Sequence, residues 1–244
     1  MEYTMGYAYE NLQIAVFGQG VLDITEPNTV MNTLWQGTKE YFAYRAQSIH
    51  WQRVANDAHP SAARTIRTQV QTQTQTHTDD MRADGYIIKT RGHVVGMLTR
   101  DCHTAVLHFG DERPIAVLHC WRGSVCNPQQ LQDWEDSVVL KAVTKLSEYG
   151  TPDELHAYIL AGIAPQHFNN ERYPEILARL RTWGAQAVLD DVCINIPAIV
   201  QYQLVHAGVL RTHIHTDTVD TFLDPAFGSY RAEKPGHNVV LVGH

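Results

Sequence analysis

Short apolar runs between residues 86 and 120 predict the central sheet of the protein. They cover residues 86–89 (YIIK), 94–99, 104–109 and 114–120, with turn-forming residues such as Arg91-Gly92 between them. The last two runs are apolar on both faces, as expected for strands that are covered on both sides. We therefore expect 94–99, 104–109 and 114–119 to lie inside one sheet.

Apolar residues at helical spacing predict three helices in the second half. The first starts at Asn127-Pro128, a typical N-cap and first-turn pair, and continues to Gly150. The others cover about 170–183 and 197–206, the latter with Gly208 as its C-terminal cap.

Strand-like segments alternate with these helices. They cover 156–164, 187–189, 212–219 and 232–242. The chain has no Pro/Ser linker and no repeat of 20 to 50 residues. This pattern predicts one α/β domain over 1–244, with a mixed central β-sheet flanked by helices.

Composition narrows the class of function. The 244 residues include 19 Lys and Arg against 26 Asp and Glu, a formal net charge of −7, with no basic stripe to attract nucleic acid. No apolar run approaches the roughly 18 residues of a membrane span, and the first ten residues lack the features of a secretory signal. We expect a cytoplasmic protein that acts on a small molecule, with no nucleic-acid or membrane partner.

Three residues at strand ends offer a ligand set for a metal: His77, Cys102 and His119. A catalytic zinc site needs three protein ligands and one open position, and sulfur with imidazole is a normal combination. Spacing alone favours the plainer interpretation, one inert buried cysteine and two ordinary histidines. His77 also ends an alternating tract, 68–78 (TQVQTQTQTHT), whose composition favours a polar low-complexity segment over a strand.

Four short motifs change this balance. QTH at 75–77, ADGYI at 83–87, TRDC at 99–102 and IAVLHCWRG at 115–123 occur in the order of the family motifs Q-V-H-G, A-D-A, T-A-D-C and V-H-A-G-W-R-G. The sequence thus resembles the laccase-domain family, also called multi-copper polyphenol oxidoreductases or YfiH-like proteins. The resemblance extends to the C-terminal part, through IAPQHF at 163–168, the segment 190–209 and GSYR at 228–231.

The resemblance implies a YfiH-like fold and a metal held by His77, Cys102 and His119. Zinc is the expected ion, with copper as the alternative. It also implies a purine nucleoside substrate, processed by adenosine deamination or, with phosphate, by phosphorolysis.

Further site residues follow from the same motifs. Asp101 is a candidate proton shuttle or support for the metal ligands, although on a strand it would face away from Cys102. Arg122 is a candidate for binding phosphate or orienting substrate, with a surface ion pair as the equal alternative. A candidate nucleoside pocket, or else a plain turn before the last strand, comprises Ser229, Tyr230 and Arg231.

The chain departs from the family pattern mainly on the expected phosphate side. Residues 17–30 lack the family's N-L-G motif, and Leu34 falls where the family has an arginine. Gln166 replaces the first cysteine of the family's pocket segment, and Ala232 replaces its second arginine. We therefore expect deamination to be better preserved than phosphorolysis.

Three other functions stay open. A copper-dependent polyphenol oxidoreductase would need a weak axial ligand, for which Met97 is the plausible residue. A Cys102 nucleophile with His119 as its base would make a deamidase-like hydrolase. A family member without activity would be a binding module. His213 and His215 form H-x-H on an expected strand, and exposed strand histidines are favoured over a second metal site.

Overall fold

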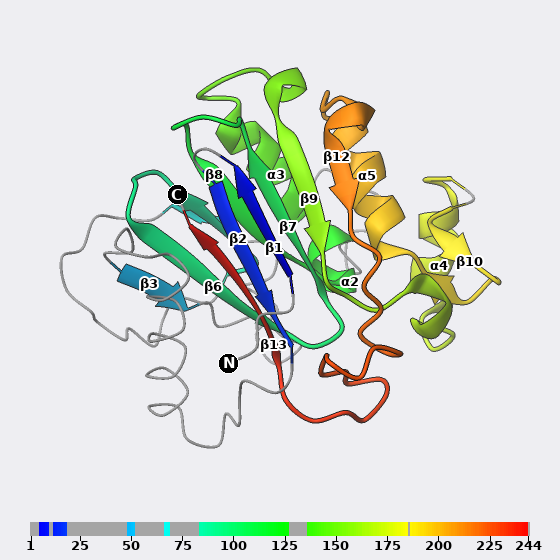
Figure 1. Ribbon diagram of the computed structural model, residues 1–244. Helices are drawn as coiled ribbons and strands as arrows, with labels where there is room; N and C mark the ends of the chain where they lie inside the picture. Colours follow the sequence, from blue (N-terminus) through cyan, green and yellow to red (C-terminus); the bar gives the residue numbers. More distant parts are fainter. Residues whose placement is uncertain are drawn as a thin grey trace.

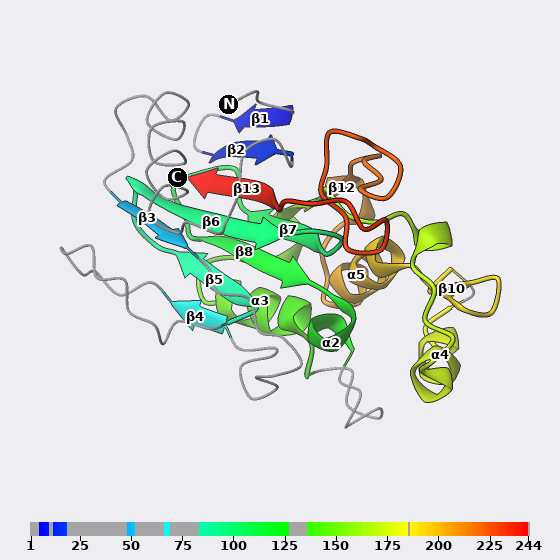
Figure 2. The ribbon, with the colours of Figure 1, turned by 90° about the horizontal axis from the view of Figure 1, so that it is seen from below.

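Two β-sheets lie face to face, and helices cover the outer face of one of them (Figure 1). Figure 2 shows these three layers from the side, with β13 and β6 above, β7 and β8 in the middle and α3 below. The computed structural model describes residues 5–9, 12–18, 48–51, 66–68, 83–126, 136–184 and 186–243.

The outer sheet has five described strands in the order β1-β2-β13-β6-β3. All neighbours are antiparallel except β3 and β6. Although β13 comes last in the chain, it lies in the middle of this sheet. The strands are β1 (Met5–Tyr9), β2 (Leu12–Phe17), β3 (Ser48–Trp51), β6 (His93–Thr99) and β13 (Asn238–Gly243).

The inner sheet has six described strands in the order β12-β9-β7-β8-β5-β4. The outermost pairs, β12 with β9 and β4 with β5, are parallel, and the central pairs are antiparallel. The strands are β4 (Ile66–Thr68), β5 (Gly85–Ile88), β7 (His103–His108), β8 (Ile115–Cys120), β9 (His156–Leu160) and β12 (Ile214–Thr216).

Both faces of β7 and β8 in the inner sheet are buried, as their apolar runs predict. Val106 and Val117 contribute to a core between the two sheets, together with Met97 of β6. Leu107 and Leu118, one residue further along, contribute to a second core beneath the helices, the helix-side core. Alternation along each strand therefore sends successive side chains into different cores.

Four described α-helices and a small hairpin complete the fold. Apolar positions of all four contribute to the helix-side core, which stabilises them more than helix propensity does. The elements are α2 (Arg122–Val125), α3 (Val138–Leu146), α4 (Pro174–Arg181), α5 (Ile196–His206), and the strands β10 (Val188–Leu189) and β11 (Cys193–Ile194). None of the helices in the described ranges is long and apolar enough to cross a membrane.

Several predicted boundaries move inward. The helix expected from Asn127 begins only at Val138, because Ser137 has an extended backbone and its hydroxyl accepts a hydrogen bond from the Leu140 N–H at 3.1 Å. Residues 127–135 lie outside the described part. The strand expected over 156–164 ends at Leu160, since the next residue, Ala161, has a φ of +24°.

The mixed α/β fold is confirmed, but one sheet was predicted where two exist. The run 94–99 forms β6 in the outer sheet, whereas 104–109 and 114–119 form β7 and β8 in the inner one. Consecutive apolar strands give the same sequence pattern in one sheet as in two stacked sheets, so periodicity could not separate them.

Candidate metal centre

Pairing of β7 with β8 brings Cys102 next to His119. Thr104 lies opposite His119 in the register. Cys102, two residues before Thr104, is therefore the diagonal neighbour of His119 on the same face. The Cys102 sulfur is close enough to the His119 ring to act on its protonation. Cys120 alternates to the other face and lies in the helix-side core, where burial raises the pKa of its thiol.

The carboxylate of Asp84 holds the other side of the His119 ring. Nδ1 of His119 lies 3.0 Å from Oδ1 of Asp84, and the backbone N–H of His119 donates to the Asp84 carbonyl at 2.7 Å. The indole N–H of Trp121 donates to the same carboxylate oxygen at 3.2 Å. The side chains of this buried pair, His119–Asp84, are 4% and 0% exposed.

Neighbouring charged groups affect the pKa of His119 more than its burial does. Burial alone would lower its pKa, but the Cys102 sulfur and the Asp84 carboxylate raise the pKa of His119 to about 9. Since Asp84 engages Nδ1, the nitrogen left for a metal or for the thiol is Nε2. The sequence shows Asp84 only as part of the ADG motif; its position directly before a buried strand was the available signal.

These residues fit a metal site. A thiolate beside an imidazole whose second nitrogen is held by a carboxylate is the usual arrangement at zinc. The third expected ligand, His77, lies outside the described residues. Within the ranges that are described, no three or more potential ligands are placed to hold an ion.

Asp101 fastens the turn before Cys102 to the C-terminal loop, residues 217–237. Its Oδ1 accepts a hydrogen bond from the Thr221 hydroxyl at 3.0 Å, and its Oδ2 accepts one from the Arg231 backbone N–H at 2.8 Å. Its carbonyl accepts from the Ile163 N–H at 2.9 Å. This geometry suits a residue that holds Cys102 in place, and the predicted proton shuttle stays a prediction.

Arg122 opens helix α2 with its guanidinium in a defined position. Nη1 donates to Oδ1 of Asn170 at 2.8 Å, and the guanidinium lies 3.7 Å from the centre of the Tyr173 ring. These contacts come from an amide and an aromatic ring. Phosphate binding by Arg122 stays a prediction.

The predicted nucleoside segment forms a turn in the C-terminal loop. The Ser229 hydroxyl is buried and accepts from the Ala232 N–H at 3.1 Å. Arg231 donates from Nη1 to the Asn169 carbonyl at 2.9 Å. Tyr230 is 71% exposed, with its ring 5.7 Å from the Arg100 guanidinium, and Arg231 is exposed as well.

A second histidine–carboxylate pair lies behind the Cys102 turn. Nδ1 of His167 lies 2.8 Å from Oδ2 of Asp220, and the His167 ring stacks on Phe222 with 4.3 Å between ring centres. The two side chains of this rim pair, His167–Asp220, are 23% and 14% exposed. The sequence contained IAPQHF and VDTF but no spacing that joined them, so this pair was not predicted.

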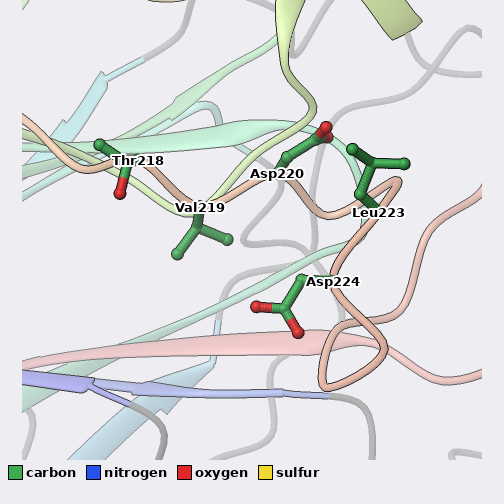
Figure 3. Close-up of a pocket in the computed structure, with 5 residues that line it drawn as sticks. All are labelled: Thr218, Val219, Asp220, Leu223 and Asp224. Atoms are coloured by element: carbon green, nitrogen blue, oxygen red, sulfur yellow. The ribbon is translucent and has the colours of Figure 1, made fainter.

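An open pocket lies on the C-terminal loop (Figure 3). Its volume is about 430 Å³, and neither Cys102 nor His119 lines it. In Figure 3 the Asp220 carboxylate and the Val219 side chain point in opposite directions from the loop. The lining residues are Thr218, Val219, Asp220, Leu223 and Asp224.

Two other predicted features take different places. Met97 lies in the core between the sheets. His213 was expected on a strand, but it lies in the 3₁₀ turn Arg211–His213. Its ring stacks on that of His156, with 4.2 Å between ring centres. His215 is an exposed residue of β12 and stacks on Tyr158 at 5.0 Å.

Comparison with known proteins relates the whole arrangement to one family. A family model described as "Multi-copper polyphenol oxidoreductase laccase" matches residues 31–244. No match was found among curated protein sequences.

Solved structures share the fold at low sequence identity. The hypothetical protein YfiH of Bacillus licheniformis is 13% identical, with a TM-score of 0.74 over 95% of this chain and 92% of that chain. YlmD of Geobacillus stearothermophilus is 15% identical, with a TM-score of 0.70 over 97% and 93%. Neisseria meningitidis protein NMB0706 is 13% identical, with a TM-score of 0.74 over 100% and 99%.

Proposed function

The chain belongs to the multi-copper polyphenol oxidoreductase laccase family, and we propose that it is a metal-dependent enzyme acting on purine nucleosides, with adenosine deamination as its main reaction. The observation that carries the proposal is the array of Cys102, His119 and Asp84, in which a thiol and an imidazole meet and a buried carboxylate orients the imidazole. Phosphorolysis with inorganic phosphate is the second reaction of the same site.

The ligands would be Cys102, His119 and His77. When bound, a zinc-like ion lowers the pKa of a water molecule toward neutrality, which is what hydrolytic removal of an amino group requires. Asp84 keeps Nδ1 of His119 engaged, so that Nε2 is the nitrogen left for the ion. Asp101 keeps the Cys102 turn in place through its two hydrogen bonds to the C-terminal loop.

Substrate contacts would come from the C-terminal loop and helix α2. The exposed ring of Tyr230 offers a surface on which a purine can stack. Arg122, held by Asn170 and Tyr173, keeps further N–H groups that can bind phosphate. Ser229 and Arg231 shape the turn that carries Tyr230.

The test is metal analysis combined with a nucleoside panel. Purified protein should contain zinc and convert adenosine to inosine, with free adenine appearing only when phosphate is supplied. Cys102→Ala should lose metal and activity together, while the matched variant Cys126→Ala, which removes a thiol from the helix-side core, should keep both. No turnover of adenosine, inosine, guanosine or methylthioadenosine by metal-loaded protein would leave a binding module as the function.

Copper-dependent oxidation of phenols is the reaction in the family's description. A blue-copper site would need a weak axial ligand, and Met97 packs instead in the core between the sheets. The same metal analysis decides this point: copper in the purified protein, with oxidation of a phenol and no nucleoside turnover, would replace the nucleoside proposal.

A thiol hydrolase is the second candidate, because Cys102, His119 and Asp84 also form the order of nucleophile, base and orienting carboxylate. The two chemistries respond oppositely to reagents. A metal enzyme loses activity with a chelator and regains it with zinc. A thiol hydrolase keeps activity in the chelator and loses it when iodoacetamide alkylates Cys102.

A further inference from the structure

The rim pair, His167–Asp220, has the form of a catalytic dyad. His167 ends the 3₁₀ turn Pro165–His167, and Asp220 belongs to the C-terminal loop. A carboxylate only accepts hydrogen bonds, so Asp220 selects the form of the ring in which Nδ1 carries the proton. Nε2 is then left as the basic nitrogen.

Both members of the rim pair are held firmly. Oδ1 of Asp220 accepts hydrogen bonds from the backbone N–H of Ala164 at 3.0 Å and of Phe222 at 3.1 Å. The plane of the His167 ring is set by stacking on Phe222, with 12° between the ring planes. In the described part of the chain no residue hydrogen bonds to Nε2 of His167, and the side chain is partly open to solvent.

The rim pair lies against the turn that carries Cys102. Thr221, the residue after the pair's carboxylate, donates its hydroxyl to Asp101, which directly precedes Cys102. On the other side, the backbone of Asp220 pairs with Gly162, and the ring of His103 packs on that glycine. The rim pair is thus connected to both residues that flank Cys102, to Asp101 through Thr221 and to His103 through Gly162.

We propose that His167 is a catalytic proton-transfer residue of this enzyme and that Asp220 is its positioning residue. The inference rests on the proposed deamination. As the oxygen of a water molecule bonds to C6 of adenosine, Nε2 of His167 takes one proton from that water. The C6–N bond then breaks as the same proton passes to the departing amino nitrogen, which leaves ammonia and the 6-hydroxy tautomer of inosine.

His167 suits this role better than the acidic residue nearest to Cys102. Both oxygens of Asp101 already accept hydrogen bonds, from Thr221 and from the Arg231 backbone. His167 is held through one nitrogen and keeps the other for a proton.

The first experiment compares kcat and KM for adenosine in wild type, His167→Ala and His206→Ala. His206 is an exposed histidine at the end of α5 and serves as the matched control. Loss of a general acid–base residue lowers rates by roughly 10²- to 10⁴-fold, so His167→Ala should lose at least about 100-fold in kcat with KM little changed. Added imidazole should restore part of the His167→Ala activity, which a purely structural role would not allow, and His206→Ala should match the wild type.

The second experiment measures the protonation form of the ring directly. In ¹⁵N NMR spectra of the wild-type protein, the signal that disappears in His167→Gln should show a protonated Nδ1 and a bare Nε2. Asp220→Asn should shift that signal toward a mixture of both forms, and should lower kcat without rescue by imidazole.

The outcomes separate the two proposals. An active wild type together with a fully active His167→Ala variant overturns the role of His167 and leaves the deaminase standing. A His167 ring with its proton on Nε2 overturns the role as well. A wild type that turns over no nucleoside overturns the deaminase and, with it, the proton transfer.

Discussion

The buried pair and the rim pair are the same chemical pair in two surroundings. His119 and Asp84 lie at the end of the core between the sheets, whereas His167 and Asp220 join two loops at the surface. In the buried pair, neighbouring charge raises the pKa of His119 to about 9 against the effect of burial. In the rim pair, solvent reaches the side chains. Burial thus closes one pair off from water and leaves the other open to it.

The largest predicted effect is on the buried pair. Asp84→Ala leaves the His119 ring and the Trp121 N–H without their acceptor in a site closed to water. Removing one partner of a buried charged pair costs roughly 3–5 kcal/mol, so the midpoint of urea unfolding should fall strongly. Asp84→Asn keeps an oxygen in place and should lose less. A loss below about 1 kcal/mol for Asp84→Ala would contradict the description of this pair as structurally buried.

The next largest effect on stability concerns Gly162, which pairs with the backbone of Asp220 and packs on the His103 ring. A Cβ at Gly162 would lie 2.4 Å from Nδ1 of His103, so Gly162→Ala forces the ring or the turn to move. Overpacking of this kind costs roughly 1–3 kcal/mol, measurable by urea unfolding. In a His103→Ala background the same substitution should be nearly neutral. Equal losses in both backgrounds would mean that the His103 ring is not what limits this position.

A smaller effect is expected for the rim pair. Asp220→Ala removes acceptors from His167 and from two backbone N–H groups at a partly exposed position, which should lower the free energy of unfolding by about 1–2 kcal/mol. Asp224→Ala, in the same loop, removes the acceptor of the Ala226 N–H and should change stability less. A loss for Asp220→Ala as large as that for Asp84→Ala would erase the distinction between the two surroundings.

The smallest predicted effect on stability concerns His156 and His213, whose rings stack on each other instead of pairing with a carboxylate. Burial, with the neighbouring His213 and His215, lowers the pKa of His156 below its ordinary value of 6.5. The ring of His108 on β7 lies 5.6 Å from the His156 ring and 5.6 Å from the ring of Tyr158 on β9. The folded state therefore binds fewer protons here than the unfolded chain.

The free energy of unfolding should show no loss from this cluster above pH 6.5. It should decline as the pH falls below 6.5 toward the folded-state pKa of His156. Urea unfolding at several pH values on both sides of 6.5 measures this slope. His156→Gln should make the slope shallower. A slope that is unchanged in His156→Gln would assign the pH dependence to other groups.

Periodicity predicted the elements of the fold better than their arrangement. The runs that became β6, β7 and β8 were all identified, because apolar residues in short stretches bounded by turns have few other uses. Their division between two sheets depends on long-range pairing with β13 and β2, which no local pattern records. Helix α3 begins at Val138 and not at the predicted Asn127 because the backbone of Ser137 is extended. The side chain of Ser137 then caps the helix.

The site was predictable where residues act in short motifs and hidden where they act across the chain. Cys102 and His119 stood out through their motifs, and strand pairing does bring them together. The partners that orient the site come from elsewhere: Asp84 from before β5, and Asp220 and Thr221 from the C-terminal loop. His77 lies outside the described residues, so its part in the metal site stays a prediction.

The long span of the Asp101 contacts bears on how the protein is made. Its carboxylate meets Thr221 and Arg231, which lie 120 and 130 residues further along the chain. Strand β13 completes the outer sheet between β2 and β6 and is synthesised later still. While the ribosome translates the residues before Thr221, neither of these two carboxylate contacts can form. The metal site proposed at Cys102 would therefore reach its final geometry only after residues 221–243 have been synthesised, and until then this thiol would need protection from oxidation.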